Sequence, residues 1–123
     1  MTNLEMVAAE LEAAKKKHPK FVDCLVRAYD DNYNIHVKGR RGNKAHIREA
    51  RDNLQGFRDD LKWWQDNKLV DVADILSCEI CEAEEAYLTN DFAHARQEFA
   101  QCAAVCIRAM EYIQQQQQTE ETK

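Results

Sequence analysis

The sequence predicts an all-α protein, a helical bundle of about five helices that ends in an antiparallel helix hairpin. Only three Gly and one Pro interrupt the 123 residues, and so few helix breakers favour long helices over strands and turns. Apolar residues recur every three or four positions along most of the chain, which is the period of a helix with one buried face. Polar segments rich in capping residues separate these amphipathic stretches.

The composition narrows the class of protein further. Hydrophobic residues make up 45% of the chain and charged residues 32%, which is typical of a folded domain outside the membrane. The start of the chain alternates acidic and apolar residues, unlike a signal peptide, so we expect a cytoplasmic protein with no membrane contact. The net charge of −5 argues against stable binding to nucleic acid. Five Cys in such a compartment are expected to stay reduced.

Two helices are predicted in the first part of the chain. Thr2 and Glu5 fit a capping box, and residues 15–17 are all Lys, as suits the end of a helix. Pro19 fits the first position of a second helix, because its missing N–H would be unpaired there anyway. The buried face of that second helix would consist of Phe21, Leu25 and Ala28 or Tyr29.

A basic segment follows, within residues 30–43. Two of the three Gly lie here, beside Lys38, Arg40 and Arg41. Such a segment could close over a triphosphate as a basic loop, or it could be a solvated loop with no ligand. We take Lys38, Arg40 and Arg41 as candidate substrate-binding residues.

Three longer helices are predicted in the rest of the chain, over residues 44–66, 68–88 and 92–113. The turn between the last two falls at residues 89–91, where Thr, Asn and Asp supply turn and capping chemistry. Residues 1–113 would form a single domain, and the polar, glutamine-rich residues 114–123 a disordered tail. The inward face of the last helix is predicted from its apolar stripe, Phe99, Ala103, Cys106, Met110 and Ile113.

Acidic residues recur at matching heights on the two helices of this hairpin. Glu79 and Glu82 are three apart, and so are Glu98 and Gln101, so each pair shares one face of its helix. With the turn centred near residue 90, Glu82 lies opposite Glu98 and Glu79 opposite Gln101. Three converging carboxylates would repel one another unless a cation lay between them, and Mg²⁺ or Mn²⁺ suits oxygen ligands. The alternative is that these residues are solvated surface glutamates.

The same segments, Ile75 to Ala83 and Arg96 to Arg108, resemble the core hairpin of MazG-like nucleoside triphosphate pyrophosphohydrolases, especially the short forms found in phages. The resemblance implies that Glu79, Glu82 and Glu98 bind Mg²⁺, with Glu82 and Glu98 in the catalytic centre. Gln101 stands at the edge of the site, where the family pattern has Asp. The implied reaction is hydrolysis of a nucleoside triphosphate to the monophosphate and pyrophosphate, by a homo-oligomer that we expect to be a dimer.

Other chemically distinctive residues have two interpretations each. Trp63 lies off the apolar stripe of its helix, so it is a candidate substrate-binding residue that could stack on a nucleotide base, or sit in a subunit interface; the other interpretation is simple packing. The pairs Cys78-x-x-Cys81 and Cys102-x-x-x-Cys106 could bind Zn²⁺, but small core residues are the better interpretation, because the knuckle turns of zinc sites are missing.

The leading hypothesis is therefore a metal-dependent nucleotide pyrophosphohydrolase. Its alternative is a non-enzymatic helical interaction module, such as a small phage or host regulator, that uses the apolar stripes as a partner surface.

Overall fold

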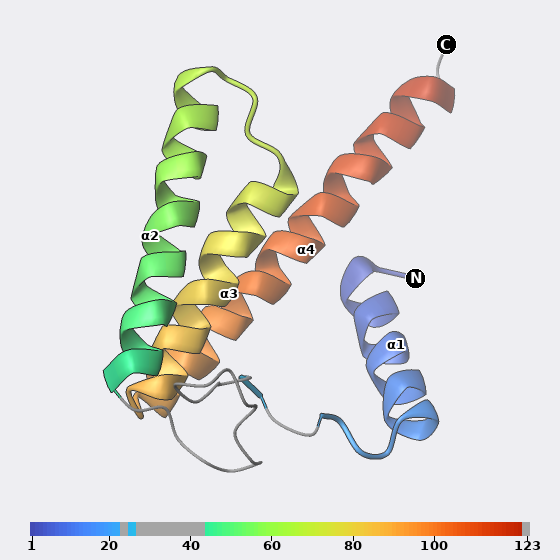
Figure 1. Cartoon of the computed structure of the whole chain (residues 1–123). Helices are drawn as coiled ribbons and strands as arrows, with labels where there is room; N and C mark the ends of the chain where they lie inside the picture. The colour runs from blue at the N-terminus through green and yellow to red at the C-terminus, as the bar shows by residue number, and fades with distance from the viewer. Residues whose placement is uncertain (23–24, 27–43, 122–123) are drawn as a thin grey trace. The chain divides into compact units, whose positions relative to one another are not determined.

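The computed structural model describes residues 1–22, 25–26 and 44–121, and these residues contain helices and no strand. The all-α class is therefore confirmed. The described residues form four helices, labelled in Figure 1, in place of the five or so expected: α1 (Asn3–Lys17), α2 (Lys44–Asp66), α3 (Val72–Leu88) and α4 (Phe92–Glu121).

The missing element is the helix predicted to start at Pro19. Its described residues, 19–22 and 25–26, are not helical, and the rest of it, with Lys38, Arg40 and Arg41, lies outside the described residues. The side chain of Phe21 is 82% exposed. A short helix is marginal in water unless its apolar face packs against something, and Phe21 has no such packing.

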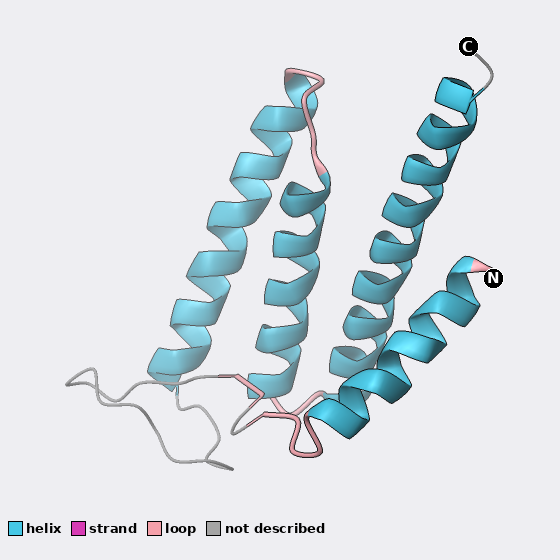
Figure 2. Ribbon diagram, turned by 90° about the vertical axis from the view of Figure 1, so that its right-hand side faces the viewer, coloured by secondary structure: helices cyan, strands magenta, loops and turns pink. Residues whose placement is uncertain are grey.

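The chain divides into two compact units, one of residues 1–23 with 106–123 and one of residues 24–105. The second unit holds α2, α3 and the first part of α4, which run in alternating directions along the chain (Figure 1). Figure 2 shows α2 and α3 side by side in this unit. The predicted single domain of residues 1–113 stays a prediction.

The first unit contains α1, which begins as the sequence predicts. The Thr2 side chain accepts a hydrogen bond from the Glu5 amide, and the Glu5 carboxylate accepts one from the Thr2 amide, so the capping box is confirmed. No residue of α1 is buried. In the same unit the Asn3 side-chain amide donates to Oε1 of Gln114 at 2.8 Å.

α4 is the longest helix, with 30 residues. It continues through residues 114–121, although the polar sequence there predicts a disordered tail. Gln and Glu lose little side-chain freedom in a helix, so a polar segment can extend a helix that is already formed. No helix in the described part of the chain is both long and apolar enough to cross a membrane.

The turn between α3 and α4 lies at residues 89–91, as predicted. Asn90 has a positive φ of 67°. Its amide donates to the Tyr87 carbonyl at 3.1 Å, and the Asp91 amide donates to the Ala86 carbonyl at 2.9 Å. These two bonds form a Schellman motif, and Asn is one of the few residues besides Gly that tolerate its left-handed position. The motif ends α3 and allows α4 to fold back.

A second Schellman motif ends α2. Lys68 has φ 57°, its amide donates to the Gln65 carbonyl, and the Leu69 amide donates to the Trp64 carbonyl. α3 then begins with a capping box between Asp71 and Asp74. The helix predicted from residue 68 therefore starts at Val72, because Lys68 itself is left-handed.

The buried core lies in the second unit and consists mainly of small side chains. It contains Leu54 of α2, Ala95 of α4 and, on α3, Cys78, Ala83, Ala86 and Leu88. Small residues let helices approach one another closely. The predicted inward face of α4 is largely wrong, because Phe99 is 37% and Ile113 55% exposed. The buried residues of α4 are Ala95 and Glu98, since the hairpin turns that flank of the helix toward α3.

Candidate functional site

Glu79 and Glu82 of α3 and Glu98 of α4 come together in the second unit. Each offers a carboxylate oxygen, and these oxygens all lie within 4.8 Å of one another. Among the described residues, no other group of three or more His, Cys, Asp or Glu side chains is placed to share a metal ion. The predicted convergence across the hairpin is therefore confirmed. We call these three residues the glutamate cluster.

Burial differs within the glutamate cluster. Glu98 is only 5% exposed, and it is the single buried charged residue in the described part of the chain. Glu79 and Glu82 are half-buried. A carboxylate withdrawn from water is costly unless it is protonated, paired or bound to a cation. Glu98 is therefore the member of the cluster that most needs a bound cation or a hydrogen-bond donor beside it.

Gln101 supplies one such partner. Its nearest polar atoms are oxygens of Glu79 and Glu98, so the hydrogen-bond network orients its amide nitrogen toward them. In that orientation Nε2 donates to Oε2 of Glu79 at 2.8 Å and to Oε2 of Glu98 at 3.2 Å. Gln101 thus contacts Glu79, as the predicted register requires. It stabilises the negative charge by donating N–H groups and would become an oxygen ligand only by turning its amide over.

Arginines of α2 supply the positive charge around the cluster. Nη2 of Arg58 lies 3.1 Å from Oε1 of Glu82, and Nε of Arg51 lies 2.9 Å from Oε1 of Glu85. Neither arginine is among the site residues predicted from the sequence. The signal that could have found them is their spacing of seven residues, which puts them on one face of α2. Only the packing of α2 against α3 shows that this face meets the acidic side of α3.

His94, one turn before Glu98 on α4, is a third partner. Its Nε2 lies 3.0 Å from Oε1 of Glu98, and its Nδ1 lies 3.7 Å from Oδ2 of Asp91. Burial, together with contacts to the carboxyls of Glu79 and Glu82, raises the pKa of Glu98 from 4.5 to about 7, while the bond to His94 opposes the shift. Glu98 therefore shares or gains a proton near neutral pH when no cation compensates the cluster.

A pocket of about 220 Å³ lies beside the cluster. It borders the cluster through Glu82, and α2 contributes the guanidinium of Arg58 to its wall. Apolar side chains (Leu54 and Ala86) and several charged groups line it together, and such a mixture is usual in small-ligand sites. The lining residues are Leu54, Arg58, Glu82, Glu85, Ala86, Thr89 and His94.

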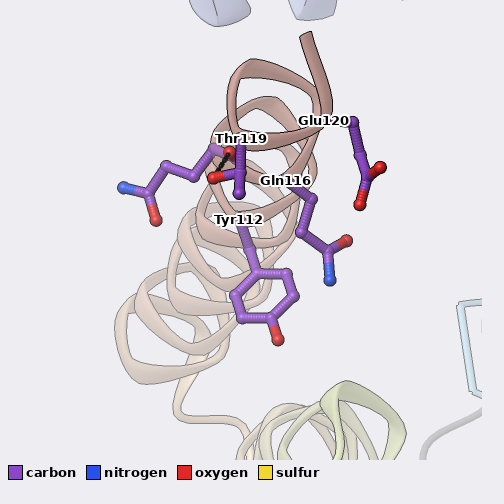
Figure 3. Close-up of a pocket in the computed structure, with 5 residues that line it drawn as sticks. Tyr112, Gln116, Thr119 and Glu120 are labelled. Carbon is purple, nitrogen blue, oxygen red and sulfur yellow. Dashed lines mark hydrogen bonds between the residues drawn. The ribbon is translucent and has the colours of Figure 1, made fainter. Parts of the chain in front are cut away.

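A larger hollow of about 570 Å³ lies along the last turns of α4, and Figure 3 shows it. Its described lining residues, Tyr112, Gln115, Gln116, Thr119 and Glu120, all belong to this one helix. The Thr119 hydroxyl donates to the Gln115 carbonyl at 2.9 Å. The hollow gathers no set of catalytic or metal-binding groups, so we assign no chemistry to it.

Trp63, the remaining candidate for substrate binding, lies away from the cluster's pocket. Its side chain is 57% exposed and packs edge-on against Trp64, with ring centroids 4.7 Å apart. It does not belong to the described residues that line the pocket beside Glu82. Its role in binding a base stays a prediction.

The cysteines of the hairpin do not assemble into a metal-binding group in the described part of the chain. Cys78, Cys81 and Cys106 carry free thiols. Burial raises the pKa of the Cys78 thiol, which the carboxylate of Glu82 raises further, and burial likewise raises the pKa of Cys81. Both thiols are therefore poor nucleophiles and poor zinc ligands at neutral pH, and Cys78 is part of the buried core.

The donor set of the glutamate cluster fits a hard divalent cation. Carboxylate oxygens from two helices, one of them buried, are ligands that Mg²⁺ and Mn²⁺ prefer. The fold and site together define an all-α protein with a carboxylate cluster in a helix hairpin. Comparison with known proteins adds no relative, since no protein-family model, curated protein or solved structure matches the chain.

Proposed function

We propose that this protein is a divalent-cation-dependent nucleotide pyrophosphohydrolase of the MazG-like kind, acting on free nucleoside triphosphates in the cytoplasm. One observation carries the proposal. The three glutamates that the resemblance assigns to Mg²⁺ lie within 4.8 Å of one another, although they come from two helices. Surface glutamates would not need to converge in this way, and burial of Glu98 adds a cost that a bound cation would offset.

In this proposal Glu79, Glu82 and Glu98 hold the cation, and Gln101 lies at the edge of the site. A cation bound there would polarise the phosphate oxygens and activate the attacking water. Glu82 and Glu98 are the proposed catalytic residues, as the resemblance implies, and each offers a carboxylate oxygen within 4.8 Å of the other across the hairpin. The proposed substrate-binding residues remain Trp63 and the basic residues Lys38, Arg40 and Arg41.

The test is a panel of nucleoside triphosphates with Mg²⁺ or Mn²⁺, with pyrophosphate release as the readout. We expect pyrophosphate and a monophosphate from at least one nucleotide, and no release by Glu82→Gln or Glu98→Gln. The matched control is Glu111→Gln, which removes an exposed carboxylate of α4 outside the cluster. Absence of cation binding at millimolar Mn²⁺ would exclude the proposed activity.

A second candidate, the interaction module, is favoured by the outer face of α4. Phe99, Ala103, Cys106 and Ile113 lie along one face of α4 and are exposed, and Met110 between the last two is half-buried. Exposed apolar residues of this kind can pack against a helix of a partner protein. They can equally pack against a second copy of the chain, which would give the expected homodimer. Light scattering that shows only a 14.3 kDa species would count against the dimer. Mn²⁺ binding at the cluster discriminates the enzyme from the module.

A further inference from the structure

Arg58 takes part in two features of the site at once. Its guanidinium pairs with Glu82, a member of the glutamate cluster, at 3.1 Å. The same side chain lines the pocket of about 220 Å³ beside the cluster. It is 51% exposed, so a rotation of its side chain meets no packed core. The Arg58 guanidinium can therefore break its ion pair with Glu82 and still line the pocket.

A divalent cation at the cluster would compete with Arg58 for Glu82. Both would bind the single carboxylate of Glu82, and a nearby double positive charge repels a guanidinium. Once its carboxylate is taken, Arg58 needs another anion. The planar guanidinium matches phosphate through two parallel hydrogen bonds, and the pocket that Arg58 lines has room for such a group.

We propose that Arg58 is a phosphate-binding residue that exchanges Glu82 for a phosphate group of the nucleotide when the cation binds. This inference rests on the proposed function and extends it, because neither the resemblance nor the sequence pattern assigns a role to any residue of α2 near the cluster. The exchange couples the two ligands: the cation releases the guanidinium, and the phosphate keeps it from returning to Glu82.

Arg51 provides a matched control from the same face of α2. It pairs with Glu85 at 2.9 Å, as close as the Arg58 pair, and it is similarly exposed. Glu85 does not belong to the glutamate cluster, and Arg51 is absent from the described residues that line the pocket. Arg51→Met and Arg58→Met remove the same charge and keep an apolar stem, so any difference between them reports the pairing with Glu82.

The first measurement is Mn²⁺ titration by calorimetry without nucleotide. Arg58→Met should bind Mn²⁺ about three- to tenfold more tightly than wild type, because Glu82 loses its competitor. Arg51→Met should stay within about twofold of wild type, since exposed charges farther away are screened. Thermal melts of each variant in chelator show whether it folds, and Arg58→Lys, which keeps the charge, should bind Mn²⁺ nearly as wild type does.

The second measurement is binding of inorganic triphosphate to the Mn²⁺-loaded protein. Arg58→Met should weaken it at least about tenfold, Arg58→Lys less, and Arg51→Met by no more than about twofold. Equal behaviour of Arg58→Met and Arg51→Met in either titration overturns the exchange. If wild type binds Mn²⁺ but the two variants behave alike, only this inference fails. If wild type binds no Mn²⁺, the proposed function fails with it.

Discussion

The side-chain amide of Gln101 donates to the carboxylate of Glu79 across the α3–α4 hairpin, at 2.8 Å. A neutral amide thus lies next to the cluster, at the position where the pattern of the proposed family has a fourth carboxylate. Through its second bond, to Glu98, it stabilises two members of the cluster without adding charge. The cluster is therefore less negative, and less dependent on a cation, than it would be with Asp at position 101.

Gln101→Asp should make the glutamate cluster more negative and more dependent on a cation. The substitution removes an N–H donor and adds a carboxylate, so we expect Mn²⁺ binding to strengthen about tenfold or more and any hydrolytic activity to rise. In chelator the variant should melt at a lower temperature, because four carboxylates repel. Gln97→Asp, on an exposed position of the same helix, makes the same chemical change outside the cluster. Calorimetry that finds equal Mn²⁺ affinities for the two variants would contradict the prediction.

Stability in chelator should fall as pH rises toward 7. The pKa of Glu98 is raised from 4.5 to about 7 in the folded protein, so between these values the folded state holds a proton that the unfolded state has lost. The resulting decrease in the free energy of unfolding begins near pH 4.5 and is complete above about pH 7. Its magnitude is on the order of 3 kcal/mol at most. Urea unfolding at a series of pH values measures it.

Glu98→Gln isolates the contribution of this carboxyl. The variant keeps the shape of the side chain and cannot ionise, so its stability should depend less on pH in this range and should equal or exceed that of wild type at pH 8. Glu111→Gln, at an exposed position of α4, should leave the wild-type dependence in place. A Glu98→Gln protein with an unchanged pH dependence would show that the cluster does not hold this proton.

Lys68→Gly should stabilise the protein. Lys68 has φ 57° at the end of α2, where a side chain costs roughly 1 kcal/mol that Gly avoids. Gly also makes the unfolded chain more flexible, which offsets part of this gain. We therefore expect the free energy of unfolding to rise by only about 0.5–1 kcal/mol. The control, Lys62→Gly inside α2, should lose about 1 kcal/mol. Thermal melts that show a loss at both positions would contradict the left-handed turn.

Gly56→Ala should also stabilise the protein. Gly56 lies inside α2, and an added Cβ would meet nothing within 4 Å. Alanine is favoured over glycine in a helix interior by about 1 kcal/mol, so a gain of that size is expected in chemical unfolding. A loss of stability, or a change in oligomer size by light scattering, would indicate that a partner surface covers this face of α2.

The sequence by itself determined part of the local structure, although it missed the helical residues 114–121 and predicted a helix from Pro19 whose described residues are not helical. Helix periodicity, the capping box at Thr2 and the turn at Asn90 depend on contacts within a few residues, and these predictions are confirmed. The facing of Glu79 and Glu82 toward Glu98 was also predictable, because a short turn leaves an antiparallel hairpin little choice of register.

Only the tertiary structure decided what surrounds the cluster. Arg58 reaches Glu82 because α2 packs on α3, and no spacing within either helix contains that information. Likewise the buried flank of α4 runs through Ala95 and Glu98, although its apolar stripe runs through Phe99. Periodicity reports which face is apolar, whereas burial depends on how closely two helix backbones approach, and small side chains such as Ala83 and Ala95 permit the closer contact.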